Sequence, residues 1–108
     1  MDEREFMAAA DAELARIETA LEVACDSGVA DFDFETKPGG VIEVEFDNGS
    51  KIILNRHGAA REIWLAAKSG GYHFRPEGGK WLGTRDGEEL LAALSRTLSE
   101  QAGVRIEL

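Results

Sequence analysis

The fold of this chain is decided by residues 41–74, which read VIEVEFDNGSKIILNRHGAAREIWLAAKSGGYHF. Apolar and polar side chains alternate through Ile42, Val44 and Phe46, and a period of two is typical of a half-buried β-strand. Asn48-Gly49 then supplies two residues that tolerate positive φ, which predicts a hairpin turn. The whole stretch predicts four sequential antiparallel strands joined by short turns.

The alternation also selects the register of the first hairpin. A three-residue loop at 47–49 pairs Val44 with Ile52 and gathers the apolar side chains on one face. A two-residue loop would mix polar and apolar side chains on both faces, because a slip of one residue turns every side chain over. We therefore expect a bulge at Gly49. The other, open face of the sheet is then expected to carry Ile53, Asn55 and Trp64.

Two amphipathic helices are expected outside this stretch. In residues 3–24 the apolar side chains recur at spacings of three and four, which predicts one buried stripe. A second helix is expected to begin at Asp86 and Glu89, which resemble a capping box, and to end at Gly103. The prediction is an α+β fold in a single domain, residues 1–108, with both helices on one face of a meandering antiparallel sheet of five to seven strands.

The charge of the chain is unevenly distributed. The formal net charge is −9 at pH 7. Residues 1–47 contain 14 acidic and 3 basic residues, a balance of −11, and residues 48–108 have a balance of +2. Such a surface repels phosphate backbones and attracts cations or a basic protein, so we expect no nucleic-acid partner.

Several features predict a cytoplasmic protein. Cys25 is the single cysteine, so no disulfide is expected and a reducing compartment fits. No apolar run is long enough to span a membrane, and the start MDEREF lacks the basic region of a signal peptide. We therefore expect no membrane partner and no targeting segment.

A set of carboxylates, called the acidic ridge below, is the first candidate site. Its members lie on the first helix and the first strand, and carboxylate oxygens suit iron and other hard cations. No ligand spacing typical of a tight cage is present, so we expect weak, multi-site binding. The alternative is that these acids form a solvated helix face and protect a strand edge. The acidic ridge consists of Asp11, Glu18, Glu22, Asp26, Asp31, Asp33 and Glu35.

Trp64 is the second candidate. A Trp that points outward in the middle of a sheet is unusual and indicates an interface anchor. Ile53 and Asn55 are expected beside it on the open face. The alternative is that the strand parity is misjudged and Trp64 belongs to the core. His57, expected in a loop, and His73, on a strand, are interpreted as two scattered surface residues. No catalytic constellation is evident, because no base can be placed beside Cys25.

The segments NGSKIILNR and EIWLAAKSGGYHF, followed by a Trp-Leu pair and by Arg-Asp-Gly-Glu before a Leu-rich helix, resemble the frataxin family, and in particular its bacterial members. The resemblance extends over essentially the whole chain. It implies an α–β–α sandwich and a non-enzymatic protein that binds Fe²⁺ or Fe³⁺ weakly and takes part in iron–sulfur cluster assembly. The implied partners are the cysteine desulfurase and the iron–sulfur scaffold protein.

The resemblance assigns iron binding and docking most directly to five members of the ridge, with Asp11 and Asp26 as neighbours, and assigns partner contact to Asn55 and Trp64. Two departures stand out. Val23, Ala24 and Cys25 replace acids that often continue the ridge, and Gly71 replaces a basic residue of eukaryotic frataxins. A monomer without iron is expected. An acidic interaction module with incidental metal binding, or a weak ferroxidase, stays open as an alternative.

Overall fold

The computed structural model describes residues 1–108, and its elements follow one another in the order expected of an α+β protein. In chain order the elements are α1 (Glu3–Asp26), β1 (Phe32–Lys37), β2 (Val41–Phe46), β3 (Lys51–His57), β4 (Glu62–Ala67), β5 (Gly70–Glu77), β6 (Lys80–Gly83) and α2 (Leu90–Ala102).

The helix α1 is defined at both ends by local hydrogen bonds. Asp2 accepts a hydrogen bond from the backbone N–H of Glu5 at 2.8 Å, and the Glu5 side chain accepts from Asp2 N–H, which together form a capping box. At the other end Gly28 adopts φ 70°, a conformation that stops the helix. The expected apolar stripe is buried throughout, from Phe6 to Leu21.

The six strands pair in sequence order, β1 to β6, and every pair is antiparallel. The β2–β3 hairpin has the expected register, with Val44 opposite Ile52 and Ile42 opposite Leu54. Phe46 N–H donates to Ser50 at 2.9 Å, and Gly49 has φ 86°, as the bulged turn requires. The segregation of apolar side chains therefore predicted this register correctly.

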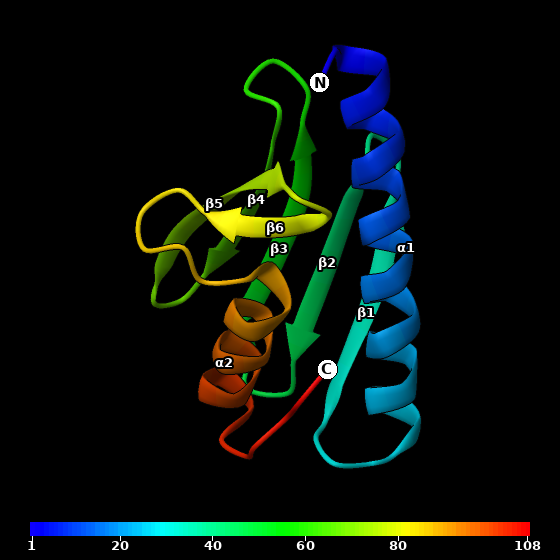
Figure 1. The fold of residues 1–108 in the computed structure, drawn as a ribbon. Helices are drawn as coiled ribbons and strands as arrows, with labels where there is room; N and C mark the ends of the chain where they lie inside the picture. Colours follow the sequence, from blue (N-terminus) through cyan, green and yellow to red (C-terminus); the bar gives the residue numbers. More distant parts are fainter.

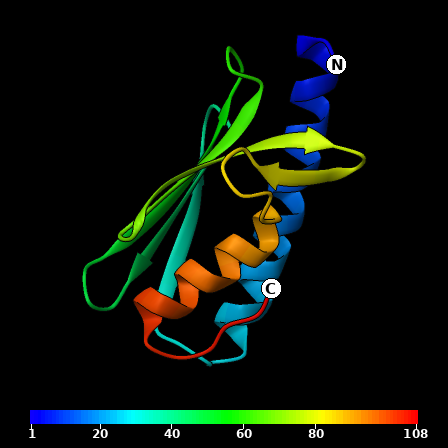
Figure 2. The ribbon, with the colours of Figure 1, turned by 60° about the vertical axis from the view of Figure 1, so that its left-hand side comes forward.

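Both helices cover the same face of the sheet, and the other face is open (Figures 1 and 2). Inward side chains of the strands, such as Leu54, Leu65 and Phe74, form one cluster with the apolar faces of α1 and α2. Trp81 of β6 is buried against Phe6 of α1, with ring centroids 5.9 Å apart. The expected fold class and helix placement are confirmed.

Two boundaries differ from those expected. The helix α2 begins at Leu90, and its N-cap residue Glu89 makes no side-chain cap. Asp86 instead accepts from Glu88 N–H at 3.0 Å, and Gly83 N–H donates to the Glu88 carbonyl at 2.8 Å. These two hydrogen bonds hold the backbone before Leu90 in a turn that packs against β6, so the helix cannot begin earlier. In addition, β5 extends to Glu77, so only Gly78 and Gly79 turn the chain there.

No helix in the structure combines the length and the apolarity that crossing a membrane would require.

Candidate functional site: a carboxylate groove and an aromatic sheet face

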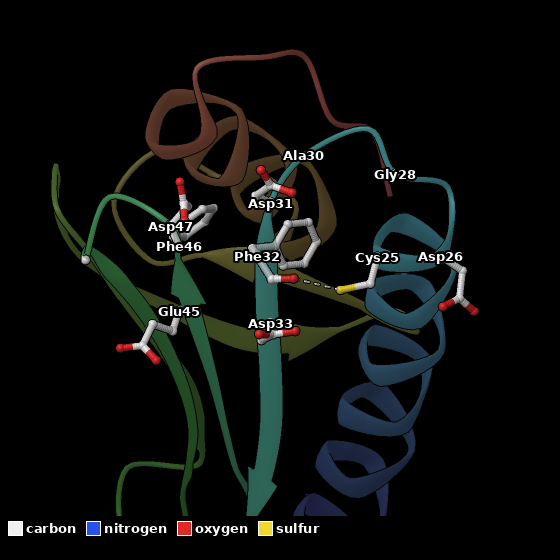
Figure 3. Close-up of a pocket in the computed structure, with 11 residues that line it drawn as sticks. Cys25, Asp26, Gly28, Ala30, Asp31, Phe32, Asp33, Glu45, Phe46 and Asp47 are labelled. Carbon is white, nitrogen blue, oxygen red and sulfur yellow. Dashed lines mark hydrogen bonds between the residues drawn. The ribbon is translucent and has the colours of Figure 1, made fainter.

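A groove of about 790 Å³ lies where the end of α1 meets β1 and the β2–β3 turn. Figure 3 shows Asp31 just before β1, Asp33 on β1 and Asp26 at the end of α1, and these three members of the acidic ridge line one hollow. All three are exposed. The alternation of extended backbone accounts for Asp31 and Asp33, because Phe32 between them is buried in the core.

The remaining members of the acidic ridge lie outside this groove. The Asp11 carboxylate pairs with the guanidinium of Arg56 on β3, so its charge is compensated within the chain. Glu18 and Glu22 lie on α1, and Glu35 lies 3.7 Å from Lys37 Nζ on β1. No three His, Cys, Asp or Glu side chains lie close enough together to form a ready-made metal site.

The groove is also lined by two acids that the sequence analysis did not include in the acidic ridge. These are Glu45 of β2 and Asp47, which follows it (Figure 3). Glu45 is the cross-strand neighbour of Asp33 in the β1–β2 register. The parity of β2 already placed Glu45 on the open face, but only the β1–β2 register brings it opposite Asp33. The groove is therefore lined by five carboxylates, of which three belong to the acidic ridge.

Glu35 and Glu43 are the next cross-strand pair on the same face of β1 and β2, and lysines compensate their negative charge. Glu43 accepts from Lys37 Nζ at 2.8 Å and from Lys51 Nζ at 3.1 Å. These hydrogen bonds, with Lys37 contributing most, lower the pKa of the Glu43 carboxyl. Uncompensated negative charge is thus concentrated at the end of the β1–β2 pair that borders the groove.

Cys25 lines the groove, and its chemistry there is that of a thiol. Its Sγ lies 3.3 Å from the carbonyl oxygen of Phe32, to which it donates (Figure 3). Burial raises the pKa of the Cys25 thiol, and the negative charges of Asp33 and Asp26 raise it further. The thiolate, which is the nucleophile and the metal ligand, is therefore disfavoured.

The open face carries Ile53, Asn55 and Trp64, as the parity predicts. Asn55 and Trp64 are direct neighbours in the β3–β4 register, and Ile53 is one of the few large apolar side chains that are exposed, at 37%. Trp64 is half-buried, while Ile63 and Leu65 on either side of it are in the core. The alternative in which Trp64 is a core residue is excluded.

The two histidines are not scattered, which corrects the sequence-based interpretation. His57 belongs to β3 rather than to a loop, and its ring stacks on Trp64 with centroids 3.9 Å apart and planes inclined by 15°. The His73 ring stacks on the other face of Trp64 at 4.5 Å and 11°. The β4–β5 register pairs Trp64 directly with His73. We call His57, Trp64 and His73 the ring ladder.

Glu62 contacts two members of the ring ladder, Trp64 and His73. Its carboxylate accepts from Trp64 Nε1–H at 2.8 Å and from Arg75 Nε–H at 2.8 Å, and it lies 3.5 Å from His73 Nδ1. Burial alone would raise the pKa of the Glu62 carboxyl, but the hydrogen bonds from Trp64 and Arg75 and the charge of Arg75 outweigh burial and lower it. The carboxylate is therefore ionised and fixes the plane of the indole.

These features define a small α+β protein that presents carboxylates at one edge of its sheet and a flat aromatic surface on the open face. The family model described as a Frataxin-like domain matches residues 1–104. The chain belongs to the frataxin family, and the resemblance seen in its sequence is confirmed.

Relatives and solved structures support this membership. An "Iron-sulfur cluster assembly protein CyaY" of Dechloromonas aromatica (strain RCB) is 56% identical over 108 residues, covering 100% of this chain and 99% of that protein. A protein of the same name from Cupriavidus taiwanensis is 50% identical over 106 residues, covering 98% and 95%. Because these names describe assembly proteins, the membership agrees with the expectation that the chain is not an enzyme.

Two solved structures share the fold. The frataxin of Psychromonas ingrahamii has a TM-score of 0.80 and 29% identity, covering 99% of this chain and 97% of its own. A trimeric frataxin of Saccharomyces cerevisiae, complexed with ferrous iron, has a TM-score of 0.76 and 25% identity, covering 88% and 86%.

Proposed function

We propose that this protein takes part in iron–sulfur cluster assembly, binding Fe²⁺ or Fe³⁺ weakly on its acidic ridge and docking on the complex of cysteine desulfurase and scaffold protein. It acts in the cytoplasm and is a monomer without iron. The observation that carries the proposal is that three exposed ridge carboxylates border one groove, in a chain whose relatives are named as iron–sulfur cluster assembly proteins.

The chemistry of the groove fits iron as a transient cargo. Its donors are carboxylate oxygens, which suit Fe²⁺ and Fe³⁺ as hard ligands, and Cys25 remains a thiol. Because no three potential ligands form a closed cage, iron keeps most of its water and exchanges readily. Weak binding of this kind is appropriate to a protein that must release or sense iron.

The same carboxylates support docking by charge. A patch of uncompensated acids attracts a basic partner surface and accelerates its approach. The open face adds contact area, with Trp64 as a partly buried aromatic anchor beside Asn55 and Ile53. The ridge and the open face meet at β1 and β2, so one partner complex can engage both.

An anaerobic Fe²⁺ titration of the ¹⁵N-labelled protein tests the iron site. We expect paramagnetic broadening of amides at residues 11–26 and 31–35, with the Trp64 indole signal unaffected. Variant Asp31→Asn/Asp33→Asn should lose the broadening at β1. Variant Glu3→Gln/Glu77→Gln, which removes two exposed acids at the opposite end of α1 and at the end of β5, should retain it. Broadening spread evenly over the surface would contradict a localised site.

A second candidate function is an acidic interaction module in which metal binding is incidental. The absence of any preformed cluster of three metal-binding side chains favours it. Neutralising Glu18, Glu22, Asp31 and Asp33 separates the two functions. If iron binding vanishes while affinity for the desulfurase survives at moderate salt, the two activities use different groups. If no localised iron binding is found in the parent protein, the interaction module is the better description.

A further inference from the structure

Glu62 is the only charged residue in the six strands that is buried, with 5% of its surface exposed. A carboxylate is costly to remove from water unless donors replace the lost hydrogen bonds. Here each oxygen has its own donor, because Oε1 accepts from Trp64 Nε1–H and Oε2 accepts from Arg75 Nε–H, both at 2.8 Å. The position of the carboxylate is therefore determined by Arg75 on one side, and it determines the position of the indole on the other.

Trp64 needs this hydrogen bond for a defined orientation. His57 stacks on one broad face of the indole with ring centroids 3.9 Å apart, and His73 stacks on the other face at 4.5 Å. Stacking defines the plane of a ring but leaves the ring free to slide or to turn over within that plane. The hydrogen bond removes this freedom, because only one orientation directs Nε1–H at the carboxylate. Glu62 thus determines which edge of the indole faces outward.

The exposed part of Trp64 is apolar. The side chain is half-buried, and its single polar atom, Nε1, is already bound within the chain. The charges around it are compensated within the chain as well, in the pairs Arg56–Asp11, Lys51–Glu43 and Arg75–Glu62. A partner that approaches Trp64 therefore meets carbon atoms in a fixed orientation, and no acceptor is required of it for the indole.

We infer that Glu62 is a positioning residue for docking: held by Arg75, it fixes the Trp64 indole in the orientation in which a partner receives it, and the partner contacts that ring through its carbon atoms alone. The inference rests on the docking role proposed above for the open face, and it names the residue on which that role depends. An anchor that is ordered before binding costs the complex less conformational entropy than one that is ordered on binding.

Two other roles for Glu62 give different results and can be separated from positioning. If Glu62 contributed only to stability, its replacement would lower the free energy of unfolding without changing the affinity of the folded protein. If it acted only through its charge, the effect of its replacement on affinity would shrink as salt is added, because salt screens interactions between charges. A positioning role changes the affinity of the folded protein by the same factor at any salt concentration.

The test measures the affinity of the whole protein for the purified complex of cysteine desulfurase and scaffold protein, at low and at moderate ionic strength. Glu62→Leu removes both acceptor oxygens and keeps a side chain of similar size. We expect binding to weaken about fivefold, the order expected when a long side chain must be ordered on binding, and equally at both ionic strengths. Glu77→Gln removes the same charge at the exposed end of β5 and should change affinity by less than twofold.

Two further variants make the result specific to the indole. Glu62→Gln/Arg75→Gln keeps an acceptor for Trp64 and replaces the ion pair by a pair of amides, so its affinity should return to within twofold of the parent. In a Trp64→Ala background, Glu62→Leu should change affinity by less than twofold, because no indole is left to position. Amide spectra show that each variant is folded. In Glu62→Leu the Trp64 indole N–H should exchange faster with solvent, while that of the buried Trp81 should not change.

An affinity of Glu62→Leu equal to that of the parent would overturn the inference. So would a loss that persists in the Trp64→Ala background, or one that disappears at moderate ionic strength. If Trp64→Ala weakens binding and Glu62→Leu does not, the positioning role fails and the docking role stands. If Trp64→Ala has no effect, or the parent does not bind the complex, the docking role of the open face fails as well. The Fe²⁺ titration reports on the groove beside β1 and is independent of all these outcomes.

Discussion

Glu62 is a carboxylate on the open side of a sheet, and yet it is only 5% exposed. Its burial follows from its neighbours, because Trp64, His73 and Arg75 surround it on β4 and β5. Each carboxylate oxygen has a donor, so the cost of removing the charge from water is offset by charge-assisted hydrogen bonds. Glu62 therefore joins three neighbouring side chains into one hydrogen-bonded surface.

Replacing Glu62 with Gln should lower the free energy of unfolding at pH 7 by about 1–2 kcal/mol, as expected when hydrogen bonds to a buried charge are weakened. The dependence on pH gives a sharper test. A carboxyl whose pKa is lowered by folding stabilises the protein fully above its unfolded pKa of about 4.3, and this contribution is lost as the pH falls through the lower folded pKa. The variant should therefore lose less stability between pH 5 and pH 3.

Urea unfolding at several pH values between 7 and 3 measures this effect. Glu77→Gln, at the exposed end of β5, is the matched control and should change stability by less than about 0.5 kcal/mol. A parallel loss at every pH would show that Glu62 acts only by packing. The Trp64 indole resonance should also shift in Glu62→Gln, because its N–H loses a charged acceptor.

At the scale of elements, Gln101 joins α2 to two turns of the sheet. Its Oε1 accepts from Lys68 N–H at 2.9 Å, and its Nε2 donates to Lys51 O at 3.1 Å and to Ser50 Oγ at 3.0 Å. Gln101→Ala would remove three part-buried hydrogen bonds and should cost about 1–3 kcal/mol, measured by thermal unfolding. The neighbouring Glu100→Ala removes only an exposed ion pair with Arg96 and should cost much less. Equal losses would contradict the bridging role.

The capping box of α1 is a second feature at this scale. Asp2→Ala removes the acceptor for Glu5 N–H and should lower the free energy of unfolding by about 1 kcal/mol. Hydrogen exchange should be accelerated most in the first turn, since that is where the cap acts. Glu3→Ala is the control, because Glu3 lies in the same turn and makes no cap. Uniform acceleration along α1 would indicate global destabilisation instead.

The sequence predicted those features that depend on a single strand or helix. Parity alone placed Trp64 on the open face, and the segregation of apolar side chains predicted the register of the β2–β3 hairpin. What could not be predicted depends on pairing between strands. His57 and His73 are 16 positions apart, and only the registers of β3–β4 and β4–β5 bring both to Trp64. The predicted start of α2 was wrong for a similar reason. The backbone hydrogen bond between Gly83 of β6 and Glu88 holds the chain in a turn, so the helix does not begin at Asp86.

At the scale of the whole molecule, charge is separated along the sheet. The groove beside β1 and β2 collects acids, and the strands β3 to β6 carry a basic excess. Asp33 and Glu45 face each other directly across β1 and β2, and like charges in that position destabilise a sheet. We therefore interpret the groove as a place where stability is reduced in favour of binding a cation or a basic partner.

This interpretation predicts that relieving the repulsion stabilises the fold while weakening its ligand site. Asp33→Asn/Glu45→Gln should raise the free energy of unfolding by about 0.5 kcal/mol. Added salt should stabilise the parent protein more than the variant, because salt screens a repulsion between Asp33 and Glu45 that the variant no longer has. Urea unfolding at low and high salt measures both effects, and an Fe²⁺ titration of the same variant should show weaker broadening near the groove.

The control must change net charge without touching the groove, and Glu3→Gln/Glu77→Gln does so by the same amount. If it stabilises the protein as much as the groove variant, the effect is one of overall charge rather than of the local pair. If the groove variant is instead less stable than the parent, Asp33 and Glu45 make contacts that outweigh their repulsion. A gain confined to the groove variant, together with lost iron broadening, would connect the instability of this edge to its role as a binding site.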